Sequence, residues 1–445
     1  MFRRMLLALI LAALGPCVRA AGEDKDTTLP PPPPPQFEFG FEERFRSENW
    51  DDLADWDSES SDTLRQVRFR TRLWTSVPLG SKATFFVSLN NETRKISKPD
   101  TPFRFDEIIF ESCYLDVKFN RTFSVRAGRQ NLLRGDGLIL GDGDPLDGSR
   151  SYYYNALDAT VALPAGNLEL LAISDPHKDI YLPTLHDRDR PLVEWDEQAL
   201  GGYFTSRPLS GATVETYYFY KIEAHDQRSP DNSQYQPERR LSTLGARVTK
   251  PLGQGWSLTG EYARQWGRQH PDTDIAAWGG YAYVKKKFAA AWEPTATAGF
   301  WALSGDDPAT PADENWDPLF ARWPRWSDLY IYSLVPEKGA AYWTNLGMSQ
   351  AEVIVTPRKP FTLRGTYYYM WAWHPFPGNP AVFGPGTGRG HMLQARLDYS
   401  FGKSVKGHLQ YETMLPGSFY VGSDRAWFLR FELATTFQRA WPLRR

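Results

Sequence analysis

Arginine recurs at every second position in several segments of the chain. Arg44 and Arg46 are two residues apart, and Arg68, Arg70 and Arg72 form a run of three. A guanidinium group keeps its charge at all relevant pH values and can hold a carboxylate through two parallel hydrogen bonds. In a β-strand, a period of two places such side chains on one face. The spacing therefore predicts basic strand faces suited to carboxylated ligands.

Further basic candidates lie in other segments. They are Arg94, Arg126, Arg129, Arg364, Arg396 and Arg430. An alternative remains open, because acidic residues such as Glu42 and Glu432 lie in the same kind of segment. Opposed acids and bases on neighbouring strands form ladders that only keep a wall hydrated and rigid. The segment with Arg68, Arg70 and Arg72 contains no acidic residue, so it is the strongest ligand-binding candidate.

The segments that carry these arginines have two faces. Phe37, Phe39 and Phe41 alternate with charged residues, and Leu429 and Phe431 do the same near the C-terminus. Alternation of this kind is typical of β-strands with one apolar and one polar face. The chain contains about eighteen such segments. Their predicted ranges are 37–46, 64–77, 83–94, 107–119, 122–130, 152–163, 166–174, 197–207, 211–223, 240–250, 256–266, 276–288, 292–303, 342–356, 360–373, 390–402, 405–415 and 425–437.

The connections between these segments alternate in length. Turns such as 78–80 and 164–165 contain few residues, whereas 131–151 and 304–341 are long. Short turns on one rim and long loops on the other are typical of outer-membrane barrels. The sequence therefore predicts an all-β fold, a transmembrane antiparallel β-barrel of about 18 strands with short periplasmic turns and long extracellular loops. A barrel of this size is wide enough for an aqueous channel. We expect the 131–151 loop to fold inward and constrict it.

The composition agrees with a membrane barrel. The chain has 17 Trp, 22 Tyr and 26 Phe, yet its mean hydropathy is −0.50. An apolar lipid face with aromatic girdles, combined with a polar lumen and polar loops, produces this combination. The net charge of −2 and the pI of about 6.4 argue against nucleic acid as a partner. We expect the bacterial outer membrane as location and its lipid as a partner.

The N-terminal residues indicate export. Arg3 and Arg4 precede an apolar run, and 18–20 is a small-x-small cleavage site, which predicts a signal peptide at 1–20. Residues 21–35 form a Pro-rich periplasmic spacer, 36–437 the barrel, and 438–445 a short tail. Pro16 disfavours acylation of Cys17, which cleavage removes. Cys113 then remains alone, so an intramolecular disulfide is excluded.

Metal-binding and catalytic patterns are weak in this sequence. Asp142, Asp144, Asp306 and Asp307 could offer oxygen ligands to calcium, but they lack EF-hand spacing, and Asp next to Gly equally favours turns. We therefore expect no metal and no cofactor. The seven histidines show no metal-ligand spacing, and no serine elbow is present. We expect no enzymatic activity, with a barrel enzyme that acts on polysaccharide as the weakest alternative.

Several motifs resemble those of the alginate-export family of outer-membrane porins. They occur in the order of that family's strands and loops, at 128–130, 134–141, 155–161, 304–307, 316–320, 390–399 and 415–420. The resemblance implies an eighteen-stranded barrel and passive export of alginate through an arginine-rich pore. We therefore expect an anion-preferring export channel for alginate or a similar acidic polysaccharide, with periplasmic export partners. A general porin, or an uptake channel for small anions or oligosaccharides, is the alternative.

Overall fold

A computed structural model describes most of the predicted barrel. It covers residues 36–52, 55–60, 62–105, 108–141, 154–183, 185, 193, 196–223, 227–228, 235–236, 238–321, 324–333, 337 and 343–442. The predicted signal peptide and spacer, residues 1–35, lie outside these ranges. So do Asp142 and Asp144.

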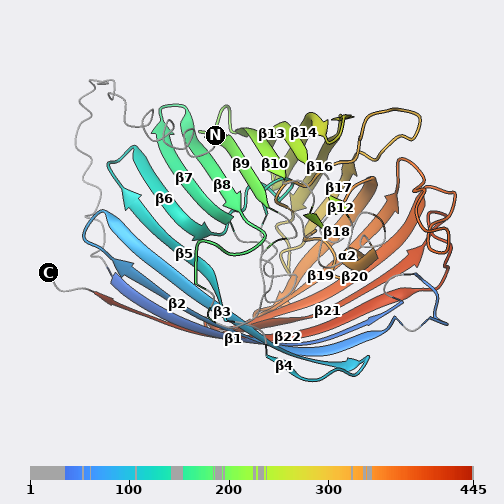
Figure 1. Cartoon of the computed structure of the whole chain (residues 1–445). Coiled ribbons are helices and arrows are strands. Elements are labelled where there is room, and N and C mark those ends of the chain that lie inside the picture. Colours follow the sequence, from blue (N-terminus) through green and yellow to red (C-terminus); the bar gives the residue numbers. More distant parts are fainter. Residues whose placement is uncertain are drawn as a thin grey trace.

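Eighteen long strands form the wall (Figure 1), because the sheet of twenty strands includes two short extensions, β4 (Arg104–Phe105) and β15 (Thr273–Ile275). The long strands are β1 (Gln36–Asp51), β2 (Leu64–Pro78), β3 (Ala83–Lys98), β5 (Ile109–Lys118), β6 (Phe123–Gln130), β7 (Tyr154–Leu163), β8 (Gly166–Asp175), β9 (Glu197–Ser206), β10 (Thr213–Glu223), β13 (Arg239–Gly253), β14 (Trp256–Gln269), β16 (Trp278–Lys287), β17 (Thr295–Leu303), β18 (Leu346–Arg358), β19 (Phe361–Trp371), β20 (Gly388–Phe401), β21 (Val405–Pro416) and β22 (Ala426–Pro442). A separate hairpin pairs β11 (Gln227–Arg228) with β12 (Tyr235–Gln236), and α2 (Tyr330–Ser333) is a single helical turn.

The strands form because their side chains alternate between two environments. Along β22, Leu429, Phe431 and Leu433 are 36–40 % exposed on the outer face. Phe428 and Arg430, on the opposite face of the same strand, are buried. A strand whose outer face is apolar and whose inner face is charged suits a wall between lipid and a polar lumen. The predicted alternation is confirmed.

The sheet closes on itself. β1 pairs antiparallel with β2 on one side and with β22 on the other, so that Phe45 lies opposite both Phe69 and Leu433. Closure leaves no unpaired strand edge in contact with lipid, as a membrane barrel requires. The prediction of an antiparallel barrel of about eighteen strands is therefore confirmed.

The connections divide between two rims as predicted. β7 and β8 are joined by 164–165 alone, whereas β17 and β18 are separated by residues 304–345. Gln36 pairs with Pro442, so both ends of the barrel lie on the rim with the short turns.

The end of the barrel differs from the prediction. β22 continues to Pro442, and residues 438–442 pair with residues 36–40 of β1. The predicted division into a barrel ending at 437 and a tail of 438–445 was therefore wrong for 438–442. The physical reason is that β1 begins at Gln36, and its first residues need backbone partners on the neighbouring strand.

The long loops supply the packed interior. Trp316, Leu319, Phe320 and Tyr330 are each 1 % exposed or less, although they lie outside the strands or in the single turn α2. Figure 1 shows this part of the chain, with α2, inside the ring of strands. Within the described ranges, no helix is both long and apolar enough to cross a bilayer.

Candidate functional site

The arginines predicted near the closure of the barrel face the lumen but are hardly accessible. We call the inner faces of β1, β2 and β22 the seam. Arg44, Arg46, Arg68, Arg70 and Arg430 lie on the seam, and each is 6 % exposed or less. A buried guanidinium group is stable only where carboxylates or other acceptors surround it.

Acidic residues of the adjacent strands provide these carboxylates. Nε of Arg46 lies 2.6 Å from the carboxylate of Glu432, which is directly opposite on β22. Nε of Arg68 on β2 lies 3.0 Å from the carboxylate of Glu92 on β3. The seam is therefore mainly an ion-pair ladder, which was the alternative that the sequence left open.

The run of three arginines on β2 is compensated in the same way. Arg70 lies 3.0 Å from the Glu42 carboxylate of β1, and Arg72 lies 2.6 Å from the Glu111 carboxylate of β5. The side chain of Arg72 keeps 22 % exposure. β2 itself contains no acidic residue, but carboxylates of neighbouring strands compensate the run, and a single strand's sequence does not reveal them.

The other predicted arginines divide into buried and accessible ones. Arg129 is 2 % exposed, and its Nη2 lies 2.7 Å from the Asp179 carboxylate, while Arg94 is half-buried. The side chain of Arg126 is 40 % exposed although it pairs with Asp116 at 2.8 Å. Arg126 therefore presents charge to the lumen, and Arg129 holds a loop.

We call the described residues of one long loop the strut; they are 304–321, 324–333, 337 and 343–345. The strut is tied to the wall at β10 and β13. The Asp317 carboxylate accepts a hydrogen bond from Arg239 of β13. Lys221 Nζ of β10 donates to the Leu319 carbonyl oxygen at 2.7 Å. Burial raises the pKa of Asp317, while Lys221 and Arg239 oppose that shift.

A second point of the strut, eleven residues after Asp317, is tied to the opposite wall. Both Asp328 carboxylate oxygens accept hydrogen bonds from Arg430 of β22, at 2.7 and 2.8 Å. The Glu412 carboxylate of β21 accepts the backbone N–H groups of Asp328 and Leu329, both at 3.1 Å. β10 and β22 are about half the circumference apart, so the strut crosses the lumen.

The loop that follows β6 also lies inside the barrel. The backbone N–H of Phe320 in the strut donates to the Ile139 carbonyl oxygen at 3.1 Å. Arg134 Nε donates to the Glu169 carboxylate of the wall at 2.7 Å. The described part of this loop, 131–141, thus folds inward as expected, but the strut of 304–345 is the segment that crosses the lumen.

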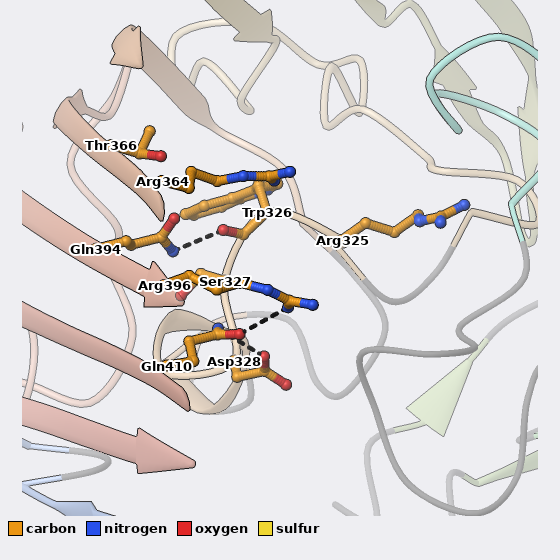
Figure 2. Close-up of a pocket in the computed structure, with 9 residues that line it drawn as sticks. All are labelled: Arg325, Trp326, Ser327, Asp328, Arg364, Thr366, Gln394, Arg396 and Gln410. Atoms are coloured by element: carbon orange, nitrogen blue, oxygen red, sulfur yellow. Dashed lines mark hydrogen bonds between the residues drawn. The ribbon is translucent and has the colours of Figure 1, made fainter. Parts of the chain in front are cut away.

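A recess remains open where the strut meets the wall. It contains three guanidinium groups, those of Arg325 in the strut, Arg364 in β19 and Arg396 in β20. Figure 2 shows Arg364 lying along Trp326, with Arg364 and Arg396 extending from the strands toward the strut. The Arg364 side chain is 46 % exposed, and its nearest carboxylate, that of Glu352, is 3.8 Å away.

The remaining charges of the recess are only partly balanced. Arg396 is held by Asp398 at 2.8 Å and by Gln410 at 3.0 Å, and its side chain stays 24 % exposed. Arg325 forms no ion pair with any residue that the structure describes. Sequence reasoning named Arg364 and Arg396 but missed Arg325, because a lone arginine in a long loop carries no periodic signal.

A second lumenal cluster combines tyrosines with one arginine. Tyr203 and Tyr217 stack with ring centroids 5.5 Å apart, and Tyr217 and Tyr281 both donate to the Glu261 carboxylate, at 2.8 and 2.7 Å. Arg247 donates to the hydroxyl of Tyr281 at 2.9 Å. All these groups are mutually satisfied, so the cluster stiffens the wall beneath the inward loop.

The calcium candidates that are described, Asp306 and Asp307, accept backbone hydrogen bonds within their own loop. Asp306 accepts the backbone N–H of Glu314 at 3.1 Å, and Asp307 accepts that of Ala309 at 2.9 Å. In the described ranges, no group of three or more His, Cys, Asp or Glu side chains could hold a metal ion.

Comparison with known proteins places this architecture in a family. A family model described as alginate export matches residues 35–425, which is most of the chain. The chain belongs to the alginate export family. No curated protein matches it in sequence.

Solved structures of similar fold support the barrel assignment. OccAB4 of Acinetobacter baumannii shares 11 % identity, with a TM-score of 0.58 over 92 % of this chain and 99 % of that one. OpdO of Pseudomonas aeruginosa shares 11 % identity, with a TM-score of 0.57 over 90 % and 97 %. OccK7 (OpdD) of P. aeruginosa shares 10 % identity, with a TM-score of 0.55 over 92 % and 100 %. At this identity, they show the fold alone. Family and fold together make this member of the alginate export family a channel of the bacterial outer membrane.

Proposed function

We propose that this alginate export family member is a passive, anion-preferring channel that exports alginate or a similar acidic exopolysaccharide. The observation that carries the proposal is the recess between strut and wall. Arg325, Arg364 and Arg396 surround an opening there, and their charge is only partly neutralised.

The chemistry of such a polymer matches the recess. Alginate has one carboxylate on each sugar, so it needs fixed positive charge along its path to offset the cost of losing water. Each contact must also stay weak, or the polymer would stop moving. Guanidinium groups that stay exposed beside their carboxylate, such as those of Arg364 and Arg126, meet both requirements.

The alternative functions differ in how they would treat the polymer. A general porin or small-solute uptake channel would conduct without recognising the polymer, and a barrel enzyme would shorten it. The family and the fold are those of channels, so we propose no catalytic activity. Polyuronate incubated with the purified protein should keep its length.

The decisive measurement is the reversal potential of the purified channel in a planar bilayer under a salt gradient, followed by addition of polymannuronate. We expect anion preference and interruption of the current by the polymer. Replacement of Arg325, Arg364 and Arg396 by Gln should lower both the selectivity and the frequency of interruptions. Arg240→Gln is a control that removes charge outside the lumen. The Arg240 side chain is 62 % exposed at the long-loop end of β13. A pore that is unselective and indifferent to polymannuronate would instead be a general porin.

A further inference from the structure

The two rims of the barrel carry charge of opposite sign. The short turns contain one acidic residue, Glu293, and five basic residues, Lys82, Arg121, Arg207, Lys359 and Lys403. The long loops are the reverse. Outside the strands, their described parts contain only Arg134, Lys178, Arg325 and Arg425 as basic residues. Their carboxylates are far more numerous, and Asp57, Glu59, Asp100, Asp272 and Asp306 are exposed examples. The net charge of −2 conceals this separation.

The basic rim has the properties of a binding surface. We call Lys82, Lys118, Arg121, Arg207, Lys359 and Lys403 the collar. All six are exposed, and none forms an ion pair with another residue in the described part of the chain. Cations that are not neutralised locally produce a field that extends about a Debye length, roughly 8–10 Å at physiological salt.

The collar continues into the lumen. Alternation along β5 places Lys118 on the same face as Asp116, the partner of Arg126. Lys406, two residues into β21, is 61 % exposed and lies 3.3 Å from the Glu42 carboxylate of the seam. Cations thus lead from the rim toward the accessible arginines of the wall, which favours a ligand that enters the lumen over a lipid headgroup that stays outside.

We infer that the collar captures the carboxylated polymer at the periplasmic mouth, and that the acidic rim with the long loops repels the polymer on the outer side. Charge alone would then make capture one-sided. The inference rests on the proposed function and adds a direction to it. A polyanion meets attraction at the rim with the short turns and repulsion at the rim with the long loops. Electrostatic steering raises association rates by roughly 10- to 1,000-fold and weakens steeply with salt.

The experiment is single-channel recording with channels of known orientation. A Ser81→Cys substitution in a Cys113→Ser background reports which side the short turns face, through a membrane-impermeant thiol reagent. Polymannuronate is added to either side at low salt. We expect interruptions from the short-turn side to be roughly tenfold or more as frequent as from the other side, and the ratio to fall at high salt.

Variants separate the collar from other causes of asymmetry. Replacing Lys82, Arg121, Lys359 and Lys403 by Glu should bring the ratio close to one, while at high salt, where the field of the collar is screened, the unblocked conductance should match that of the unmodified channel. Lys98, Arg240, Arg268 and Arg425 replaced by Glu make the same change in net charge at the opposite rim, and should keep the ratio at least as high.

The outcomes distinguish the inference from the proposed function. Equal frequencies from both sides in the unmodified channel overturn the collar inference and leave the export channel standing. Absence of interruptions from either side overturns both. If the collar variant keeps its asymmetry but is destabilised only in vesicles rich in phosphatidylglycerol, the collar is a lipid anchor and the inference is wrong.

Discussion

At the scale of single residues, the arginines of the lumen have two distinct roles that the sequence does not separate. Arg46, Arg68 and Arg70 are buried in ion pairs, so neighbouring carboxylates neutralise their charge. Arg364 and Arg126 keep 46 and 40 % of their side-chain surface exposed. Burial, and not position on a basic face, decides which arginines are available to a ligand.

A seam variant should therefore affect stability and leave selectivity nearly unchanged. Arg68→Gln leaves Glu48 and Glu92 without their shared cation. Breaking one partner of a buried pair costs about 3–5 kcal/mol, so the heat-induced unfolding seen by gel mobility should move to lower temperature. The reversal potential should stay close to that of the unmodified channel.

The double variant Arg68→Gln with Glu92→Gln provides the control. It removes one charge of each sign, so part of the lost stability should return. A large loss of anion selectivity in Arg68→Gln alone would mean that the seam contributes to the ion path after all.

At the scale of elements, the strut is a loop held at two points along its length by buried charge. Asp317 is anchored to β10 and β13, and Asp328 is anchored to β22. Each anchor places a carboxylate of the loop on a cation of a rigid strand. A loop fixed at two opposite walls keeps a constant position in the lumen, which gives the channel a defined constriction.

Releasing one anchor should therefore disturb the current. Asp328→Asn removes the charge that Arg430 holds with two hydrogen bonds. We expect more frequent conductance fluctuations on the millisecond scale and a less uniform open level, because local unfolding of a loop that has lost an anchor reaches this time range. Asp306→Asn, an exposed position in the same loop, is the matched control and should record a steady current.

The other anchor should respond to pH. Burial raises the pKa of Asp317, so this carboxyl takes up a proton at a higher pH than an ordinary aspartate. A raised pKa means that the folded barrel binds this proton more tightly than the unfolded chain, so through this group acidification does not lower global stability. It removes the charge of the anchor instead.

Fluctuations should consequently increase as the pH falls below neutral, at pH values above those at which an ordinary aspartate titrates. Asp317→Asn should show the fluctuations already at neutral pH, with weaker dependence on pH. A current that is equally steady from neutral to mildly acidic pH in the unmodified channel would contradict this assignment.

At the scale of the whole molecule, the sequence predicts the wall far better than the interior. Alternation such as that of Leu429 and Phe431 with Arg430 is local, and it locates strands within a few residues because each side chain faces lipid or lumen. The alternating lengths of the connections predict the two rims for the same reason. Only the ends of strands, such as β22 beyond Phe437, depend on a partner that is distant in the sequence.

The interior depends on contacts between distant segments. The Asp328 contact with Arg430 and the Phe320 contact with Ile139 join parts of the chain that no local pattern connects. Likewise, the compensation of Arg70 by Glu42 follows from the register of β1 and β2. The basic faces could be predicted, but which of their charges remain accessible could not, since that depends on where the strut lies.

The final strand tests whether closure depends on its last residues. Residues 438–442 pair with the start of β1, and Trp441 packs against Phe37 with ring centroids 5.7 Å apart. Removal of 438–445 leaves those backbone groups of 36–40 that face β22 unpaired at the periplasmic rim, where the bilayer interface cannot fully replace their partners. We expect slower assembly into membranes and a lower unfolding temperature of the assembled barrel. Trp441→Ala, which keeps the backbone pairing, should lose the ring contact with Phe37, about 0.5–1.5 kcal/mol beyond the buried area, together with the contact between Arg439 and the Trp441 ring. Equal assembly of the truncated and full chains would mean that closure is complete at Phe437.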